Sequence, residues 1–213
     1  IQVNDILIST KNFINKFGFN YNFKTFLKNV NSDAENSSKL KDKSQSEFLS
    51  LVSYDLNLPL IKEDTKYKNY LTPKISLRYS PNDTKNLKNE TRFLNSDNIF
   101  SLNRIGFTET IETGTSLTFG LDFEKKDEKN NTWFGSKIAT VFRDEINENL
   151  PITSTLNKKQ SDYVGEFNFI PNEIIQFNYN YSLDDDLEQI NFHKLENSLT
   201  VNNFVNTFSF YEE

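Results

Sequence analysis

The stretch that decides the fold reads Thr113-Gly114-Thr115-Ser116-Leu117-Thr118-Phe119-Gly120-Leu121-Asp122-Phe123. The odd positions from Leu117 to Phe123 are Leu or Phe. The even positions from Gly114 to Asp122 are Gly, Ser, Thr or Asp. Successive side chains of a β-strand point to opposite faces, so a period of two predicts a strand with one apolar and one polar face. Long strands of this two-faced kind are what a membrane-spanning barrel needs.

The same alternation recurs along the chain and predicts ten strands. They cover residues 2–9, 13–28, 46–60, 68–80, 111–124, 132–144, 161–170, 173–184, 187–201 and 204–213. The odd-numbered connections are short turns, and three of the four even-numbered ones are long loops, such as 29–45 and 81–110. Short turns at one rim and long loops at the other are typical of an outer-membrane barrel. The sequence therefore predicts an all-β, antiparallel, up-and-down transmembrane barrel segment.

Length and hydropathy fit this interpretation. The chain has 213 residues and contains no Met, and we expect it to be a fragment of a longer protein with no complete separate domain. It has no long apolar run that predicts a transmembrane helix. The mean hydropathy of −0.64 argues against a helical membrane protein. It is compatible with a barrel, in which only every second strand residue faces lipid.

Charge and rare residues exclude several kinds of site. The net charge of −6 argues against a nucleic-acid partner, which requires a basic surface. The absence of cysteine excludes disulfides and thiolate metal sites, and the single histidine, His193, excludes His-rich metal centres. We therefore expect no catalytic, metal or cofactor site, and no enzyme activity. His193 is interpreted as a lumen or rim residue, and the acidic corner 184–186 as a solvated turn rather than a Ca²⁺ site.

In a membrane, a charged side chain has a different energetic cost on each of the two faces of a predicted strand. An Arg or Lys at the lipid midplane costs about 2–4 kcal/mol, so Lys74, Arg78 and Lys137 are expected to face the lumen or a rim. Some aromatic residues are expected in the girdles at the membrane surfaces. The candidates are Tyr54, Tyr79, Trp133, Tyr163 and Tyr181. A soluble antiparallel sheet with one face on a core remains an alternative, because alternation alone does not separate the two.

Three segments in the middle of the chain have distinctive sequences. Residues 71–81 read LTPKISLRYSP, residues 97–106 read DNIFSLNRIG, and residues 114–121 read GTSLTFGL. These segments resemble the barrel domain of the LPS-assembly protein LptD family. Residues 178–186 (NYNYSLDDD) and 195–204 (LENSLTVNNF) extend the resemblance. Elsewhere the likeness is one of pattern and spacing.

This resemblance implies a place and a role for the chain. It implies the middle portion of a Gram-negative outer-membrane barrel that inserts lipopolysaccharide (LPS) into the outer leaflet. The implied partners are LPS, an LptE-like plug lipoprotein, outer-membrane lipids and, through an N-terminal domain that the sequence does not include, a periplasmic LptA-like bridge. The sugar portion of LPS would pass through a polar lumen while the acyl chains leave sideways.

Polar residues of the strands are the candidate lumen lining, because Asn and Ser can both donate and accept hydrogen bonds with sugar hydroxyls. The candidates are Asn20, Asn22, Ser76, Arg78, Ser116, Thr118, Asn178 and Asn180. The family-like segment 97–106 adds Asp97, Asn98, Asn103, Arg104 and Gly106. It is either an ordinary loop capped by Asn side chains or a loop that folds into the lumen. The candidate partners of Arg104 are a lipid phosphate and Glu109, and a structural salt bridge is the expected interaction.

Other classes of protein stay open at this point. A different barrel, such as a porin or a nutrient receptor, has the same strand pattern. A surface adhesin built as a β-sandwich also has alternating strands. An outer-membrane enzyme such as a lipase is disfavoured, because no Gly-x-Ser-x-Gly motif occurs.

Overall fold

One antiparallel β-sheet contains every strand formed by the residues that the computed structural model describes, which are 1–33, 44–83 and 85–212. The main path consists of β1 (Gln2–Ser9), β3 (Asn20–Ser32), β4 (Gln45–Asn57), β6 (Tyr67–Ser80), β7 (Gly114–Asp127), β8 (Thr132–Arg143), β9 (Tyr163–Phe169), β10 (Ile175–Leu183), β11 (Ile190–Val201) and β12 (Phe204–Glu212). The short strands β2 (Phe13–Ile14) and β5 (Leu60–Glu63) pair with β3 and β6.

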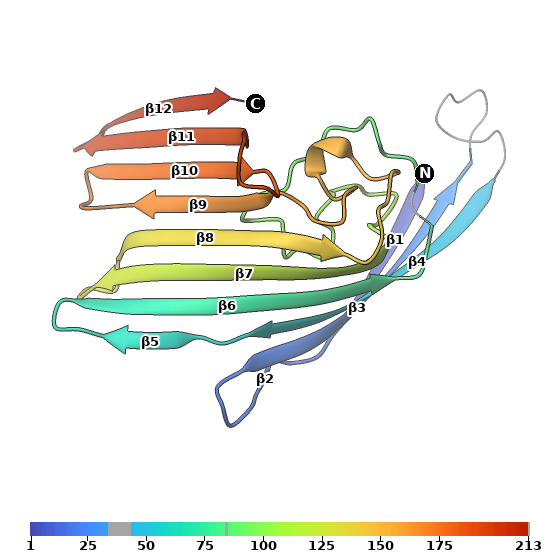
Figure 1. Ribbon diagram of the computed structural model, residues 1–213, viewed down its shortest axis with the longest axis horizontal. Helices are drawn as coiled ribbons and strands as arrows, with labels where there is room; N and C mark the ends of the chain where they lie inside the picture. The colour runs from blue at the N-terminus through green and yellow to red at the C-terminus, as the bar shows by residue number, and fades with distance from the viewer. Residues whose placement is uncertain (34–43, 84, 213) are drawn as a thin grey trace.

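The order of the main strands in the sheet is their order in the chain, so the topology is an up-and-down meander. The sheet curls but does not close, because β1 and β12 form its two free edges within the described residues (Figure 1). The predicted all-β antiparallel class and the ten main strands are confirmed. None of the helices formed by the described residues has the length and apolar character needed to cross a membrane.

Several predicted strand boundaries are wrong. The predicted strand 13–28 is split, because residues 15–19 form a tight turn between β2 and β3. In this turn the Asn15 side chain accepts hydrogen bonds from two backbone N–H groups, and Gly18 has a φ of +86°. The predicted strand 111–124 starts later, at Gly114, because Glu112 belongs to the preceding loop. Residues 34–43 of the predicted loop 29–45, residue 84 of the loop 81–110, and Glu213 lie outside the described residues.

A proline explains the interruption between β4 and β5. The β4–β6 ladder ends at the pair Asn57–Lys74, and the β5–β6 ladder begins at Leu60–Leu71. Pro59 lies in this gap and Pro73 lies opposite it, and neither has a backbone N–H to donate to the ladder. The strand expected over 46–60 therefore ends at Asn57, although the chain continues along β6.

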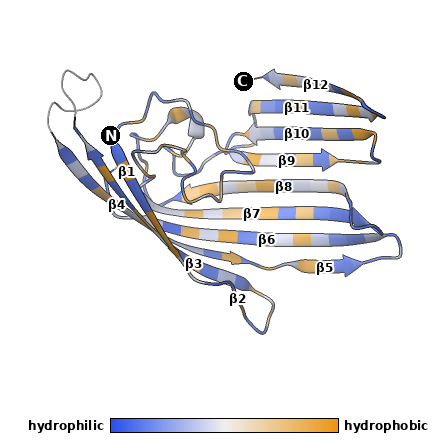
Figure 2. Cartoon of the chain, turned by 180° about the vertical axis from the view of Figure 1, so that it is seen from behind, coloured by the Kyte–Doolittle hydropathy of each residue, from blue (hydrophilic) through white to orange (hydrophobic). Residues whose placement is uncertain are grey.

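The register gives the sheet two faces of different chemistry. Residues directly opposite each other on neighbouring strands share a face. The pairs Leu77–Leu117 and Phe119–Thr140 belong to one face, on which Phe119 is 41% exposed. The pairs Arg78–Ser116 and Ser76–Thr118 belong to the other. The alternation of hydrophilic and hydrophobic residues along β6, β7 and β8 is visible in Figure 2.

Two long connections pack against the polar face, which we call the inner face; the opposite one is the outer face. They are the first loop (85–113) and the second loop (144–162), and the sheet curls around them (Figure 1). A buried apolar cluster joins them to β8 and β9. Its members are Leu94, Ile99, Ile105, Ala139, Val141, Leu150, Leu156 and Val164. The core of the described structure therefore lies between the loops and the inner face, at the end of the sheet where the long connections are.

Candidate functional site: the inner face and its loops

Paired charges cross the inner face from strand to strand. Lys24 of β3 lies 2.7 Å from Asp55 of β4, whose other oxygen accepts a 2.6 Å hydrogen bond from Ser76. Lys74 of β6 pairs with Asp122 of β7. Each lysine is joined to a carboxylate on a neighbouring or nearby strand, so the positive charge of the inner face is largely neutralised within the protein.

Further ion pairs of the inner face lie on β8 and β9. Lys137 of β8 lies 3.0 Å from Glu166 of β9 and 3.8 Å from Asp97 of the first loop. Lys74, Arg78 and Lys137, which were expected to face the lumen or a rim, all lie on the inner face. A lipid-facing position would leave each of these charges without water or an acid.

The eight predicted lining residues lie on this same face, as their register shows. They divide into two groups by exposure. Asn20, Asn22, Asn178 and Asn180 are half-buried and reach the uncovered part of the face. Ser76, Arg78, Ser116 and Thr118 are buried, each at most 3% exposed, beneath the first loop. Their contact with a transported molecule stays a prediction.

The family-like segment 97–106 is capped by asparagine side chains and packs against the inner face of the sheet, and its place in a lumen stays a prediction. The Asn98 side chain bonds the backbone of Phe93 and Asn95, and Asn103 donates to the Phe107 carbonyl. Gly106 supplies a φ of +70° to the turn that follows. The remainder of the segment lies against β6, β7 and β8.

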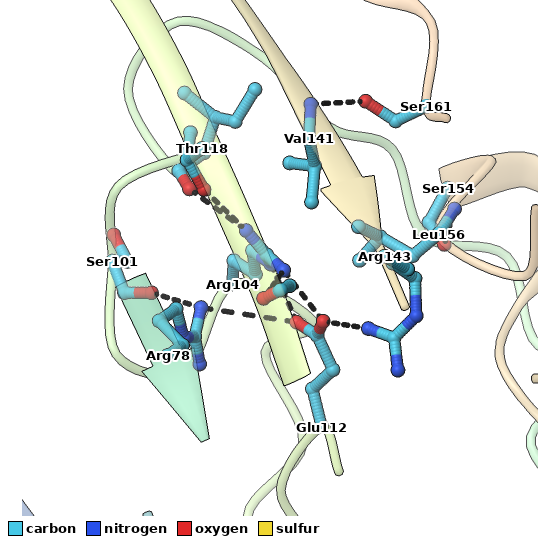
Figure 3. A network of polar contacts seen from close by, with 12 residues as sticks. Arg78, Ser101, Arg104, Glu112, Thr118, Val141, Arg143, Ser154, Leu156 and Ser161 are labelled. Carbon is cyan, nitrogen blue, oxygen red and sulfur yellow. Dashed lines mark hydrogen bonds and ion pairs between the residues drawn. The ribbon is translucent and has the colours of Figure 1, made fainter. Parts of the chain in front are cut away.

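Glu112 is the centre of a buried ion cluster between the loops and the sheet (Figure 3). Arg104 of the first loop donates to both of its carboxylate oxygens, at 2.5 and 2.6 Å. Arg143 of β8 donates to Oε1, and Arg78 of β6 lies 3.8 Å from Oε2. All four side chains are at most 3% exposed. The partner of Arg104 is therefore Glu112, and the expected pairing with Glu109 is wrong.

The arginines of this cluster also hold the loop by its backbone and by the sheet. Arg78 donates to the carbonyls of Ser101 and Leu102 in the first loop. Arg104 donates to Thr118 at 3.0 Å and to Ser116 at 2.9 Å, both on β7. Three buried guanidinium groups around one carboxylate thus join β6, β7, β8 and the first loop into one unit.

The neighbouring charges decide the protonation state of Glu112. Burial raises the pKa of this carboxyl, but the attraction of Arg104, Arg78 and Arg143 outweighs burial and lowers the pKa from 4.5 to about 2. Glu112 is therefore ionised at any physiological pH. A buried carboxylate of this kind is retained only because its partners are present.

A close ring contact adds to these bonds. The Phe100 ring of the first loop covers Gly120 of β7, where a Cβ would lie 2.7 Å from the ring.

Hydrogen bonds join the first loop to β3 and to the second loop. The Nζ of Lys28 on β3 donates a 2.7 Å hydrogen bond to the carbonyl of Thr108. The two loops are joined to each other as well, since Thr153 exchanges two 2.9 Å hydrogen bonds with the backbone of Arg92.

Sequence reasoning missed four of these residues: Glu112, Arg143, Phe100 and Gly120 were not proposed as site residues. A signal existed for Glu112, because it is a charged residue that follows the apolar Ile111 and lies two residues before the strand that begins at Gly114. For Gly120 the signal was a glycine inside a strand, which often marks close approach of another group. The identity of the partners came only from the folding of the loops.

The acidic corner 184–186 and His193 were not assigned to a metal site from the sequence, and both make structural contacts. Asp184 of the acidic corner accepts hydrogen bonds from the backbone of Glu188 and Gln189, which is a side-chain-capped turn. No group of metal-ligating side chains occurs among the described residues. His193 lies on the outer face near the start of β11, 3.0 Å from Glu212 of β12, so it does not share a face with the predicted lumen lining.

The outer face carries most of the aromatic residues of the sheet. Tyr79 is 53% exposed, and Trp133 lies at the end of β8 next to the short turns, in contact with Tyr67 and Phe169. The Tyr181 ring covers Gly165 on the neighbouring strand, with no room for a Cβ there. Exposed aliphatic and aromatic side chains without a covering layer are the surface that a bilayer requires.

A family model described as "LptD: LPS transport system D" matches residues 8–210, which run from within β1 into β12. The matched range includes both loops, the ion cluster and the paired charges of the inner face. A search of curated proteins returned no match.

Proposed function

The chain belongs to the LptD family, which transports LPS at the outer membrane, and we propose that its sheet is part of the wall of the transporting barrel. In this proposal the chain itself resides in the outer membrane and is the middle portion of a longer barrel. The inner face lines the lumen, and the outer face contacts lipid.

The observation that carries the proposal is the contrast between the two faces of one sheet. The described residues form one sheet with no second sheet over the outer face, where Leu77, Phe119 and Ile138 are each more than a third exposed. An exposed apolar face of this extent is unfavourable in water and favourable in a bilayer. The inner face buries its charges in pairs and leaves amides at its surface. This arrangement disfavours the β-sandwich adhesin, which needs two facing sheets.

The chemistry of the inner face suits a carbohydrate more than an ion. Neutralised lysines produce little net field, so a charged solute is not strongly selected. Asn20, Asn22, Asn178 and Asn180 carry amides of the kind that donates to and accepts from sugar hydroxyls, although Asn20 and Asn22 already donate to Asn57 and Asn12. We propose that these four residues contact the sugar portion of LPS or a polar plug, and that no chemical step is catalysed.

The loops held against the inner face narrow the proposed lumen from one side. Because the Glu112 cluster and the Phe100 contact tie the first loop to three strands, this loop is part of the lumen wall and not a free lid. We propose that the plug, an LptE-like lipoprotein, occupies the uncovered half of the inner face. An LptA-like bridge would deliver LPS at the rim of the short turns.

Site-specific crosslinking in the full-length protein tests this assignment. A photoreactive residue at Asn22 or Asn178 is expected to crosslink to the LptE-like plug or to LPS, because both positions lie on the inner face. The same residue at Leu77 or Phe119 is expected to crosslink to lipid acyl chains. Plug crosslinks from Phe119 together with acyl-chain crosslinks from Asn22 would reverse the faces and refute the proposal.

A further inference from the structure

Lys125 of β7 differs from the lysines of the inner face. It shares the outer face with Lys62 of β5, which lies opposite Asn69 and also makes no ion pair among the described residues. On the inner face, Lys24, Lys74, Lys137 and Lys194 each pair with a carboxylate. Lys125 lies opposite Phe134 and Asn69, on the outer face, and makes no ion pair within the described part of the chain. A lysine on a lipid-facing surface without an acid requires an anion from its surroundings.

Aromatic rings fix the position of this ammonium. The Nζ of Lys125 lies 4.2 Å from the centre of the Tyr67 ring and 4.9 Å from that of the Trp133 ring. Trp133 in turn stacks edge-on against Phe169 at 5.1 Å. Cation–π contacts hold the ammonium at the level of an aromatic girdle, where membrane proteins meet lipid headgroups.

The same two rings line a groove. Tyr67 and Trp133 form part of a groove with a volume of about 1010 Å³ between the three hairpin turns that follow β5, β7 and β9. Its other charged lining residues are Lys66, Asp127, Glu128, Lys129 and Glu173. Asp127 is engaged with Asn131, whereas Glu128 and Glu173 are exposed and make no ion pair among the described residues. The groove therefore offers the carboxylates of Glu128 and Glu173, together with the ammonium groups of Lys66 and Lys129, beside the two rings that hold Lys125.

This arrangement matches a zwitterionic headgroup. We propose that Lys125 and the adjoining groove bind an aminophospholipid, with the phosphate on the Lys125 ammonium and the amine near Glu128 and Glu173. The inference rests on the proposed membrane placement. The site lies at the rim of the short turns, which in outer-membrane barrels faces the periplasm, so its lipid comes from the inner leaflet and is a glycerophospholipid rather than LPS.

Lipid retention by the full-length protein tests the proposal. Protein is extracted from vesicles of phosphatidylethanolamine and phosphatidylglycerol, and the lipids that remain bound are counted by native mass spectrometry. Lys125→Gln is expected to retain roughly fivefold less phosphatidylethanolamine, as one lost surface lysine implies. Lys126→Gln is the matched control, because Lys126 already pairs with Glu124 at 3.2 Å. Equal retention in both variants, or equal loss in both, would overturn the proposal.

A second measurement needs no substitution. Lys125 of the wild-type protein is acylated in a maltoside detergent and in a phosphocholine detergent with the same alkyl chain, and the modified lysines are identified by mass spectrometry. Protection of Lys125 only in the phosphocholine detergent supports a headgroup site. Protection by inorganic phosphate in maltoside would show a free-phosphate site and refute the lipid assignment. Failure of the membrane placement is distinguishable, because the wild-type protein would then retain no lipid of either kind.

Discussion

Phe100 of the first loop occupies the space above Gly120 of β7 that any larger residue would need. The first loop can therefore pack this closely against β7 only because Gly120 has no side chain. Gly120→Ala places a Cβ 2.7 Å from the ring and 3.2 Å from Ala139. Overpacking of this kind costs about 1–3 kcal/mol. We expect trypsin to cleave the variant faster at Arg92, as the loop separates from the sheet.

A matched glycine on the same face serves as the control for that experiment. Gly135→Ala adds a Cβ that meets Asn168 at 3.6 Å, which is ordinary van der Waals contact. Cleavage of this variant at Arg92 is expected to match the wild type. Equal acceleration in both variants would show that the effect is general and not due to Phe100.

Glu112→Gln keeps the size of the side chain, but the Glu112 cluster predicts that it lowers the stability more than Gly120→Ala does. Glu112→Gln removes the charge that compensates Arg104, Arg143 and Arg78, all of which stay buried. Removing one partner of a buried ion pair costs about 3–5 kcal/mol. The urea midpoint of the full-length protein in vesicles is expected to fall accordingly. Glu124→Gln breaks a half-exposed pair and is expected to cost at most about 1 kcal/mol.

The same carboxyl predicts how stability depends on pH. The pKa of Glu112 is about 2 in the folded protein, below its ordinary value of 4.5. The unfolded state therefore takes up a proton first, and the contribution of Glu112 is full above about pH 4.5 and is lost as the pH falls toward 2. Its full size is on the order of 3 kcal/mol.

Urea titrations from about pH 7 down to about pH 2 measure this dependence. Glu112→Gln has no carboxyl at this position, so its stability is expected to change less over the same window. A wild-type curve that runs parallel to the variant's curve would contradict the role assigned to Glu112.

The alternation of residues was enough to predict the faces but not the turns. Leu117, Phe119 and Leu121 lie on the outer face as the period of two predicted. The turn at residues 15–19 was missed because Phe17 and Phe19 continue the same alternation through it. Asn15 and Gly18 of that turn were the available signal for it.

The ion cluster shows a different limit of the sequence. Arg78 and Arg104 were singled out from the sequence, but Glu112 was placed within a strand and Arg143 was not considered. Arg143 lies 31 residues from Glu112 along the chain. No period relates residues of an irregular loop to residues of distant strands, so their pairing follows only from the packing of the apolar cluster around Ile99 and Val141.

Depth in the membrane predicts different costs for one substitution at two positions of the outer face. Phe119 lies in the middle part of β7, whereas Val201 lies at the end of β11 beside the turn 202–203. An arginine near the lipid midplane costs about 2–4 kcal/mol and near the interface about 0–1 kcal/mol. Phe119→Arg is therefore expected to lower the free energy of unfolding in vesicles far more than Val201→Arg. Because both residues are exposed in water, with 41% and 47% of their surface accessible, a soluble sheet would tolerate both substitutions equally, and that result would contradict the membrane placement.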